Sequence, residues 1–196
     1  MFKYSTVLLA FALIGQAVAT PTARATCADV TVVFARGTTE AAPIGSIVGP
    51  PFKAALQSAL GKKSLNFIGV TYAADVAGFE AGGDPAGSKT LAANVTAQAS
   101  ACPNTKIVIS GYSQGAQLVH KGSVLLSTSV QSRVNAVVMF GDPDNGQALP
   151  GVLNSRKITF CATGDIICLG GQIITVFHLG YGANAAAAAS FVVSKI

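Results

Sequence analysis

The sequence predicts an α/β fold in which helices cover both faces of a mostly parallel sheet of five strands. Two observations support this prediction. Short apolar segments rich in β-branched residues alternate along the chain with longer segments of helix-forming residues. The stretches rich in glycine and proline, at 43–51, 78–87 and 141–151, are expected loops, and most of them follow apolar segments. Loops that follow strands bind ligands in open α/β sheets. We therefore expect one domain built as a three-layer α/β/α sandwich.

The five strands are short apolar runs without the length of a typical helix. They are VTVVF (30–34), LNFIGV (65–70), KIVIS (106–110), VNAVVMF (134–140) and KITFC (157–161).

Four helices are expected between and after these strands, at 50–60, 88–101, 116–126 and 184–195. Prolines suit the first turn of the first helix, and Gly61 suits its end. Ser88 and Asn184 are the predicted N-caps of the second and fourth helices. The alanine run at 185–189 needs no special explanation, because alanine is the best helix former.

The first 19 residues have the pattern of a secretory signal peptide. Lys3 gives a positive start, 7–14 form an apolar core too short to span a bilayer, and Ala17-Val18-Ala19 is a small-x-small cleavage site. We expect 1–19 to be removed, 20–26 to be a short pro-segment, and 27–196 to be the folded catalytic domain. The mature protein is then extracellular, without an integral membrane segment.

Composition excludes several other classes. Hydrophobic residues make up 51% of the chain and charged residues 11%, so it is not a disordered tail. The net charge is +5, but the basic residues are scattered, and we expect no nucleic-acid partner. A domain of this length buries a core without help from a second subunit, so a monomer is expected.

The secretory context gives meaning to the four cysteines, which allow three pairings. Cys161 and Cys168 are close in sequence, which favours a bond between them and leaves Cys27 to join Cys102. No Cys-x-x-Cys or histidine cluster accompanies them, so we expect no metal site. Asn94 begins an Asn-x-Thr glycosylation sequon.

The segment GYSQG (111–115) places Ser113 between two glycines, where an apolar strand passes into a helix. This is the context of a nucleophile elbow, in which a tight turn exposes the serine hydroxyl at the edge of the sheet. Side chains at either glycine would collide with neighbouring backbone. The sequence therefore predicts a catalytic serine.

Such a serine needs a histidine base, and the chain has two histidines. His120 lies seven residues further along the same helix, about 10.5 Å along its axis, and cannot reach Ser113. A structural role is expected for it. His178 is therefore the predicted base, in agreement with the chain order serine, acid, histidine.

Three aspartates lie between the serine and this histidine, namely Asp142, Asp144 and Asp165. Asp142 follows a strand, but GDPDNG (141–146) also has the composition of a turn. Asp165 lies in the loop that a Cys161–Cys168 bond would close, which would hold a carboxylate firmly. The residues favour Asp165 and leave Asp142 and Asp144 open.

Four motifs, in the same order along the chain, make this sequence resemble the fungal cutinase family. Members of that family are small secreted serine esterases with a minimal α/β-hydrolase fold. The motifs are ARGTTE (35–40), GYSQGA (111–116), CATGDIIC (161–168) and HLGYG (178–182). The resemblance implies Ser113, Asp165 and His178 as the triad, and the pairing of Cys27 with Cys102 and of Cys161 with Cys168. It also implies that no cofactor is used.

The resemblance further implies an oxyanion hole formed by Gln114 and Thr38. The family often has serine where Thr38 stands, and the threonine methyl could narrow the pocket. A simple turn and helix cap is the alternative interpretation of RGTTE.

The segment QIITVF (172–177) leads directly into His178. Ile173, Ile174, Val176 and Phe177 either form one more buried strand or border the catalytic mouth. The resemblance favours the second interpretation, with 42–51 as the opposite wall. Apolar borders suit polyester and short acyl esters, and the chain has no tryptophan to line a sugar site.

The sequence is therefore consistent with three functions. The favoured one is a secreted esterase that acts on cutin-like polyesters and short acyl esters. GDPDNG resembles acetylxylan esterases more than the best-known cutinases, so deacetylation of plant polysaccharide is an alternative. The third is a catalytically silent surface-binding protein.

Overall fold

The structure is a computed structural model that describes residue 1 and residues 27–196. Five strands form one sheet in the order β2-β1-β3-β4-β5, and each neighbouring pair is parallel. The strands are β1 (Val30–Ala35), β2 (Leu65–Gly69), β3 (Lys106–Tyr112), β4 (Val134–Phe140) and β5 (Lys157–Phe160). The predicted fold class is confirmed. Apart from Met1, the predicted signal peptide and pro-segment lie outside the described residues.

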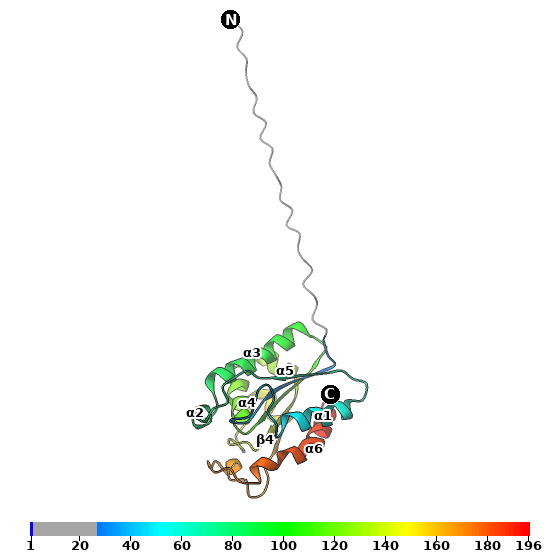
Figure 1. Cartoon of the computed structure of the whole chain (residues 1–196). Helices are drawn as coiled ribbons and strands as arrows, with labels where there is room; N and C mark the ends of the chain where they lie inside the picture. Colours follow the sequence, from blue (N-terminus) through cyan, green and yellow to red (C-terminus); the bar gives the residue numbers. More distant parts are fainter. Residues whose placement is uncertain (2–26) are drawn as a thin grey trace.

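Side chains of the central strands alternate between two apolar cores, as expected for a sheet covered on both faces. On β1, Val30, Val32 and Phe34 pack toward one face, against helices α1 (Gly49–Leu60) and α6 (Ala185–Val193). Val33 and Ala35 pack toward the other face, against α3 (Pro85–Ala101) and α4 (Gln114–Val124). Figure 1 shows α1 and α6 on one side of the sheet and α3 and α4 on the other.

Helix α1 has prolines in its first turn and ends at Gly61, as predicted. Helix α3 begins three residues earlier than predicted, because Asp84 is its cap. The Asp84 carboxylate accepts a hydrogen bond of 2.6 Å from the Gly87 backbone N–H. Ser88 instead donates its hydroxyl to the Asp84 carbonyl at 2.8 Å. The predicted cap at Ser88 is therefore wrong.

Asn184 is the N-cap residue of α6, as predicted, but its side chain makes no capping hydrogen bond. The reason is that α6 continues directly from a 3₁₀ helix, η3 (His178–Asn184). Asn184 therefore has a helical backbone, and not the extended conformation in which an N-cap side chain accepts the first N–H groups of a helix.

Several short helices were not predicted from the sequence. They are α2 (Val76–Glu80), α5 (Thr128–Arg133) and the 3₁₀ helices η1 (Gly151–Arg156) and η2 (Ile167–Leu169). Each has at most six residues, which is too short to show a 3.6-residue periodicity. Among the described residues, no helix combines the length and apolar character that crossing a bilayer requires.

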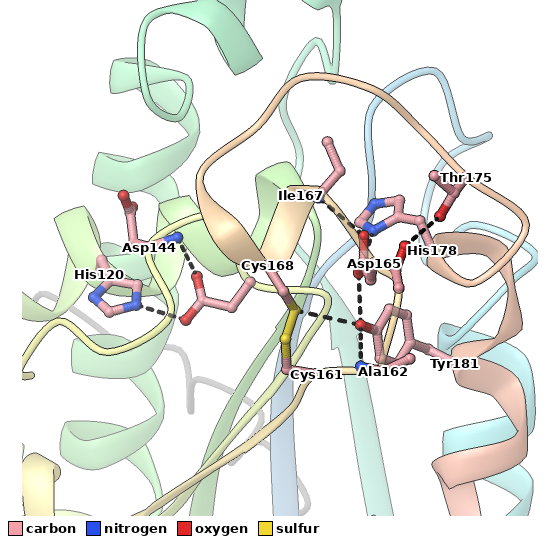
Figure 2. The surroundings of a disulfide bond; sticks show 12 residues. His120, Asp144, Cys161, Ala162, Asp165, Ile167, Cys168, Thr175, His178 and Tyr181 are labelled. Atoms are coloured by element: carbon pink, nitrogen blue, oxygen red, sulfur yellow. Dashed lines mark hydrogen bonds and ion pairs between the residues drawn. A yellow bond between two sulfur atoms is a disulfide. The ribbon is translucent and has the colours of Figure 1, made fainter.

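The two predicted disulfides are confirmed. The bond between Cys27 and Cys102, with an S–S distance of 2.02 Å, ties the chain just before β1 to the end of α3. The bond between Cys161 and Cys168 closes the loop that follows β5 (Figure 2).

Candidate active site

Ser113 lies at a tight turn between β3 and α4, with a backbone φ of 55°. A serine seldom adopts this left-handed conformation, which costs about 1–3 kcal/mol and is found mostly at functional sites. The flanking glycines permit it. A Cβ at Gly111 would overlap the carbonyl of Gly115, and a Cβ at Gly115 would overlap the carbonyl of Ala35. Both collisions are with backbone, which explains the two glycines of the motif.

The structure brings the serine, the histidine and one of the three aspartates into a hydrogen-bonded chain. The Ser113 hydroxyl and His178 Nε2 are 2.9 Å apart. His178 Nδ1 and Asp165 Oδ2 are also 2.9 Å apart. The carboxylate accepts the Nδ1 proton, which leaves Nε2 to accept the serine proton. All three residues are buried, with Ser113 6% exposed and the other two 1%.

The imidazole of His178 is fixed from three sides. Its ring stacks on Tyr112 at 5.2 Å between centroids, and Tyr181 stands edge-on to it at 6.0 Å. The Tyr112 hydroxyl donates to the His178 carbonyl at 2.9 Å. Gly141 lies against the same ring without room for a side chain, since a Cβ added there would lie 2.8 Å from His178 Cε1. The ring therefore has little freedom to rotate.

Asp165 is held inside the loop that the Cys161–Cys168 disulfide closes (Figure 2). Its Oδ1 accepts a 3.0 Å hydrogen bond from the backbone N–H of Ile167. Its Oδ2 accepts a second hydrogen bond from the Tyr181 hydroxyl at 2.6 Å, in addition to the one from His178.

His120, labelled in Figure 2, forms a second, separate pair with Asp142. His120 Nε2 donates to Asp142 Oδ2 at 2.9 Å, and both groups are nearly buried. The pair joins the α4 helix to the turn after β4. Asp142 Oδ1 also accepts the Asp144 backbone N–H at 2.9 Å. Burial raises the pKa of the Asp144 carboxyl. Neither aspartate makes a hydrogen bond to His178, so only Asp165 among the three candidates is placed beside that histidine.

The two predicted oxyanion residues lie next to each other across the β1–α1 loop and the start of α4. The Gln114 side-chain amide donates to Thr38 Oγ1 at 2.9 Å and to the Asp75 carbonyl at 2.7 Å. The Gln114 backbone N–H belongs to the first turn of α4, where an N–H has no acceptor within the helix.

Glu40 organises the loop that carries Thr38. One carboxylate oxygen accepts the Gly37 N–H at 2.8 Å, and the other accepts the N–H groups of Ser46 and Ile47 at 2.8 and 2.9 Å. RGTTE is therefore a turn with a capping carboxylate, and it also presents Thr38 toward Ser113. The two interpretations of this motif are compatible.

Two cavities open beside Ser113 and share Thr38, Ser113 and Ile174. The first has a volume of about 240 Å³, and its other lining residues are Val76, Phe79, Glu80, Ile167 and Gln172. The second has a volume of about 300 Å³ and is lined also by Thr39, Glu40, Ala41, Ser46, Ile47, Tyr112, His178 and Leu179. Residues of 42–51 thus border the second cavity, as expected.

The predicted substrate-binding residues are exposed, and the buried-strand alternative is wrong. The exposed fractions of Ile173, Ile174, Val176 and Phe177 are 65%, 59%, 75% and 52%. Ile174 lines both cavities, whereas the other three lie outside the cavity linings. The sequence reasoning missed Val76 and Phe79, because α2 was not predicted. It also missed Tyr181, although its position three residues after His178 places it on the same side of a 3₁₀ helix.

A parallel sheet covered by helices on both faces, with a serine at a strained strand-to-helix turn, defines this protein as an α/β hydrolase. Residues 26–196 match the family model described as Cutinase. The chain therefore belongs to the cutinase family of carboxylic ester hydrolases.

Individual relatives agree with this family. A cutinase of Botryotinia fuckeliana is 52% identical over 188 residues, which cover 96% of this chain and 93% of the relative. A Trichoderma reesei cutinase, solved in complex with a phosphonate inhibitor, is 42% identical with a TM-score of 0.83, covering 86% of this chain and 76% of that one. An acetylxylan esterase has a TM-score of 0.71 at 24% identity, covering 87% and 99%, which shows a shared fold only.

Proposed function

We propose that this protein is a secreted serine esterase that hydrolyses cutin-like polyesters and short acyl esters through a triad of Ser113, His178 and Asp165. The observation that carries the proposal is the unbroken chain of two 2.9 Å hydrogen bonds from the serine hydroxyl through the imidazole to the carboxylate. This is the arrangement that activates a serine nucleophile at neutral pH.

In the first half of the reaction, His178 Nε2 takes the Ser113 proton while Oγ attacks the ester carbonyl carbon. Asp165 holds the imidazole in the required tautomer and stabilises the imidazolium that forms. The imidazolium then gives its proton to the leaving alcohol as the C–O bond breaks. Water repeats these steps on the acyl-enzyme and releases the acid. None of these steps requires a cofactor or a metal ion.

The developing oxyanion is held by the backbone N–H of Gln114 and by Thr38. The Thr38 oxygen accepts a hydrogen bond from the Gln114 side chain, so its own proton is free to point toward the oxyanion. Such an arrangement is preorganised, because the donors need not reorient during the reaction.

The two cavities fit the two halves of an ester. His178 must protonate the leaving alcohol, so the cavity that His178 lines receives the alcohol portion. The other cavity, with Val76, Phe79 and Ile167 in its wall, receives the acyl portion. Its volume of about 240 Å³ suits short or medium acyl chains better than long ones.

Exposed apolar side chains beside the two cavities favour an insoluble apolar substrate. Ile173, Val176 and Phe177 present apolar surface to solvent next to the cavity residue Ile174. A patch of this kind marks an interaction surface. The relatives are named cutinases, which also favours a polyester substrate. Secretion is proposed from the signal-peptide pattern of 1–19, and two disulfides are typical of an oxidising compartment.

The experiment is a parallel assay of the purified protein on a polyester film, a short p-nitrophenyl ester and acetylated xylan. We expect hydrolysis of the first two at rates well above that on acetylated xylan. Acetylated xylan as the best substrate would favour the polysaccharide alternative. Inactivity on all three substrates would favour the surface-binding alternative.

A further inference from the structure

Tyr181 is a buried phenol that the triad mechanism leaves without a role. It is 1% exposed and lies on η3, three residues after His178. Its hydroxyl donates to Asp165 Oδ2 at 2.6 Å and accepts the backbone N–H of Ala162 at 2.9 Å. The oxygen therefore joins the element that carries the histidine to the disulfide loop that carries the aspartate (Figure 2).

The oxygen that Tyr181 contacts is the same one that faces His178. Asp165 Oδ2 accepts hydrogen bonds from both His178 Nδ1 and the phenol, whereas among the described residues Oδ1 accepts the Ile167 N–H alone. A second donor on this oxygen has two consequences. It fixes the carboxylate plane against rotation, and it withdraws part of the negative charge that the imidazolium would otherwise feel.

We infer that Tyr181 is a positioning residue for the esterase reaction, which orients Asp165 toward His178 and moderates the charge of that carboxylate. This inference rests on the proposed triad function. Tyr181 does not touch the reacting atoms, so its effect must pass through Asp165.

The phenol remains a donor over the pH range in which such an esterase works. Burial raises the pKa of Tyr181, and its hydrogen bond to Asp165 raises it further. Among the described residues, Tyr112 on β3 is a further titratable group near Asp165 and Tyr181, and Glu40 in the β1–α1 loop lies near Tyr112. Burial raises the pKa of Tyr112, with smaller contributions from Glu40 and Asp165. A change in the acidic part of the pH profile therefore reports on the histidine and aspartate, and not on a phenol.

The test is Tyr181→Phe, which removes one hydroxyl and keeps the ring volume. Thr175→Val is the matched control, because it removes the 3.2 Å hydrogen bond from the Thr175 hydroxyl to the Gly164 carbonyl of the disulfide loop. It keeps the Thr175 backbone carbonyl, which accepts the His178 backbone N–H at 3.0 Å. Both are assayed on a short soluble ester, well below their unfolding temperatures. Rates are expressed per active site titrated with a phosphonate.

For Tyr181→Phe we expect kcat to fall about tenfold or more, as for loss of a hydrogen bond to a charged group, with little change in KM. The midpoint of the acidic limb of the pH profile should move upward, since a carboxylate with undiminished charge holds the imidazolium proton more strongly. The Thr175→Val variant should keep the wild-type midpoint. An unchanged kcat and pH profile in Tyr181→Phe, with only a lower unfolding temperature, would mean that the residue is purely structural.

A double-mutant cycle separates this inference from the proposed function. If Tyr181 acts through Asp165, the Phe substitution should cost far less in an Asp165→Asn background than in the wild type. An equal loss in both backgrounds would overturn the positioning role while leaving the triad intact. Full activity of Asp165→Asn itself would instead overturn the triad assignment.

Discussion

Ser113 has a positive φ. Glycines at 111 and 115 permit this turn, because a Cβ at either position would overlap neighbouring backbone. This part of the site could be predicted from the sequence, because Gly-x-Ser-x-Gly at a strand-to-helix junction has one steric explanation. His178 could also be predicted, because the chain has only two histidines and one is too far along α4. Its 2.9 Å contact with Ser113 agrees with that elimination.

The aspartate could be favoured from the sequence but not decided. Asp142 and Asp165 both follow strands, and no spacing rule distinguishes a turn carboxylate from one that faces a histidine. The structure shows the physical difference. Asp142 forms its hydrogen bond with His120 of α4, whereas Asp165 forms its hydrogen bond with His178.

Exchange of each aspartate for asparagine tests this division. Asp165→Asn should lower kcat by orders of magnitude, about 10⁴-fold in the equivalent change of a serine protease triad, because the imidazole takes the wrong tautomer. Asp142→Asn should lower the unfolding temperature, since it weakens a buried pair, and change kcat far less. Steady-state kinetics and thermal unfolding of both variants provide the measurement. A larger kinetic loss in Asp142→Asn would move the acid to that position.

At the scale of elements, the long helices and all five strands could be predicted, and the short helices could not. Helix α2 is five residues long and begins at a cap where the Asp75 carboxylate accepts the Gly78 N–H at 2.7 Å. Its neighbouring glycines indicated a loop. The consequence for the site is that Val76 and Phe79, which line the first cavity, were missed.

Loss of one disulfide should mainly lower stability, and loss of the other should mainly lower activity. The Cys161–Cys168 bond spans seven residues and holds Asp165, whereas the Cys27–Cys102 bond spans 75 residues. A longer closed loop restrains the unfolded chain more. Replacing Cys27 and Cys102 by serine should therefore cost more stability. Replacing Cys161 and Cys168 should cost more activity per folded molecule, up to about 10²-fold if Asp165 moves by an ångström. Equal activity losses in the two variants would contradict this assignment.

The exposed segment before His178 should matter more for an insoluble substrate than for a soluble one. Ile174→Ser with Val176→Ser removes apolar surface beside the catalytic mouth. Hydrolysis of a polyester film should fall severalfold more than hydrolysis of a short soluble ester. The control is Val124→Ser with Leu125→Ser, two residues equally exposed at the opposite end of α4 from Ser113. A uniform loss on both substrates, or the same effect from the control, would count against a role in surface binding.

For the whole molecule, the three layers could be predicted because buried strands alternate with helices, and the β2-β1-β3-β4-β5 order could not. Strand order depends on which helix crosses which face, and that information is not local. The cysteine pairing could be predicted because Cys161 and Cys168 are close in sequence, which favours a bond between them, and because the resemblance to the cutinase family implies the same pairing. The distribution of cavities at the carboxyl ends of the strands depends on loop conformation, which only the structure provides.

Two buried phenols, Tyr112 and Tyr181, and the half-buried phenol of Tyr72 make the whole fold sensitive to strong alkali. Burial raises the pKa of Tyr72, Tyr112 and Tyr181 above the ordinary value of about 10. Above that pH the unfolded chain releases these protons and the folded chain retains them, so stability is lost as pH rises. The described domain holds these three of the four tyrosines, and the fourth lies in the predicted signal peptide. Absorbance at 295 nm and circular dichroism should therefore change together above pH 10. Normal ionisation near pH 10 with the fold intact would contradict this prediction.

Ser113 is the proposed nucleophile of an esterase, and covalent labelling of this residue is the most direct test of that role. The protein is treated with a serine-reactive phosphonate, assayed on a short p-nitrophenyl ester, and digested for mass spectrometry, with Ser113→Ala alongside. This variant loses one hydroxyl and no core volume, so its circular dichroism spectrum should be unchanged. We expect stoichiometric phosphonate on the peptide that contains Ser113, complete loss of esterase activity on labelling, and neither label nor activity in Ser113→Ala. Labelling of another residue, or activity retained by the alanine variant, would contradict it.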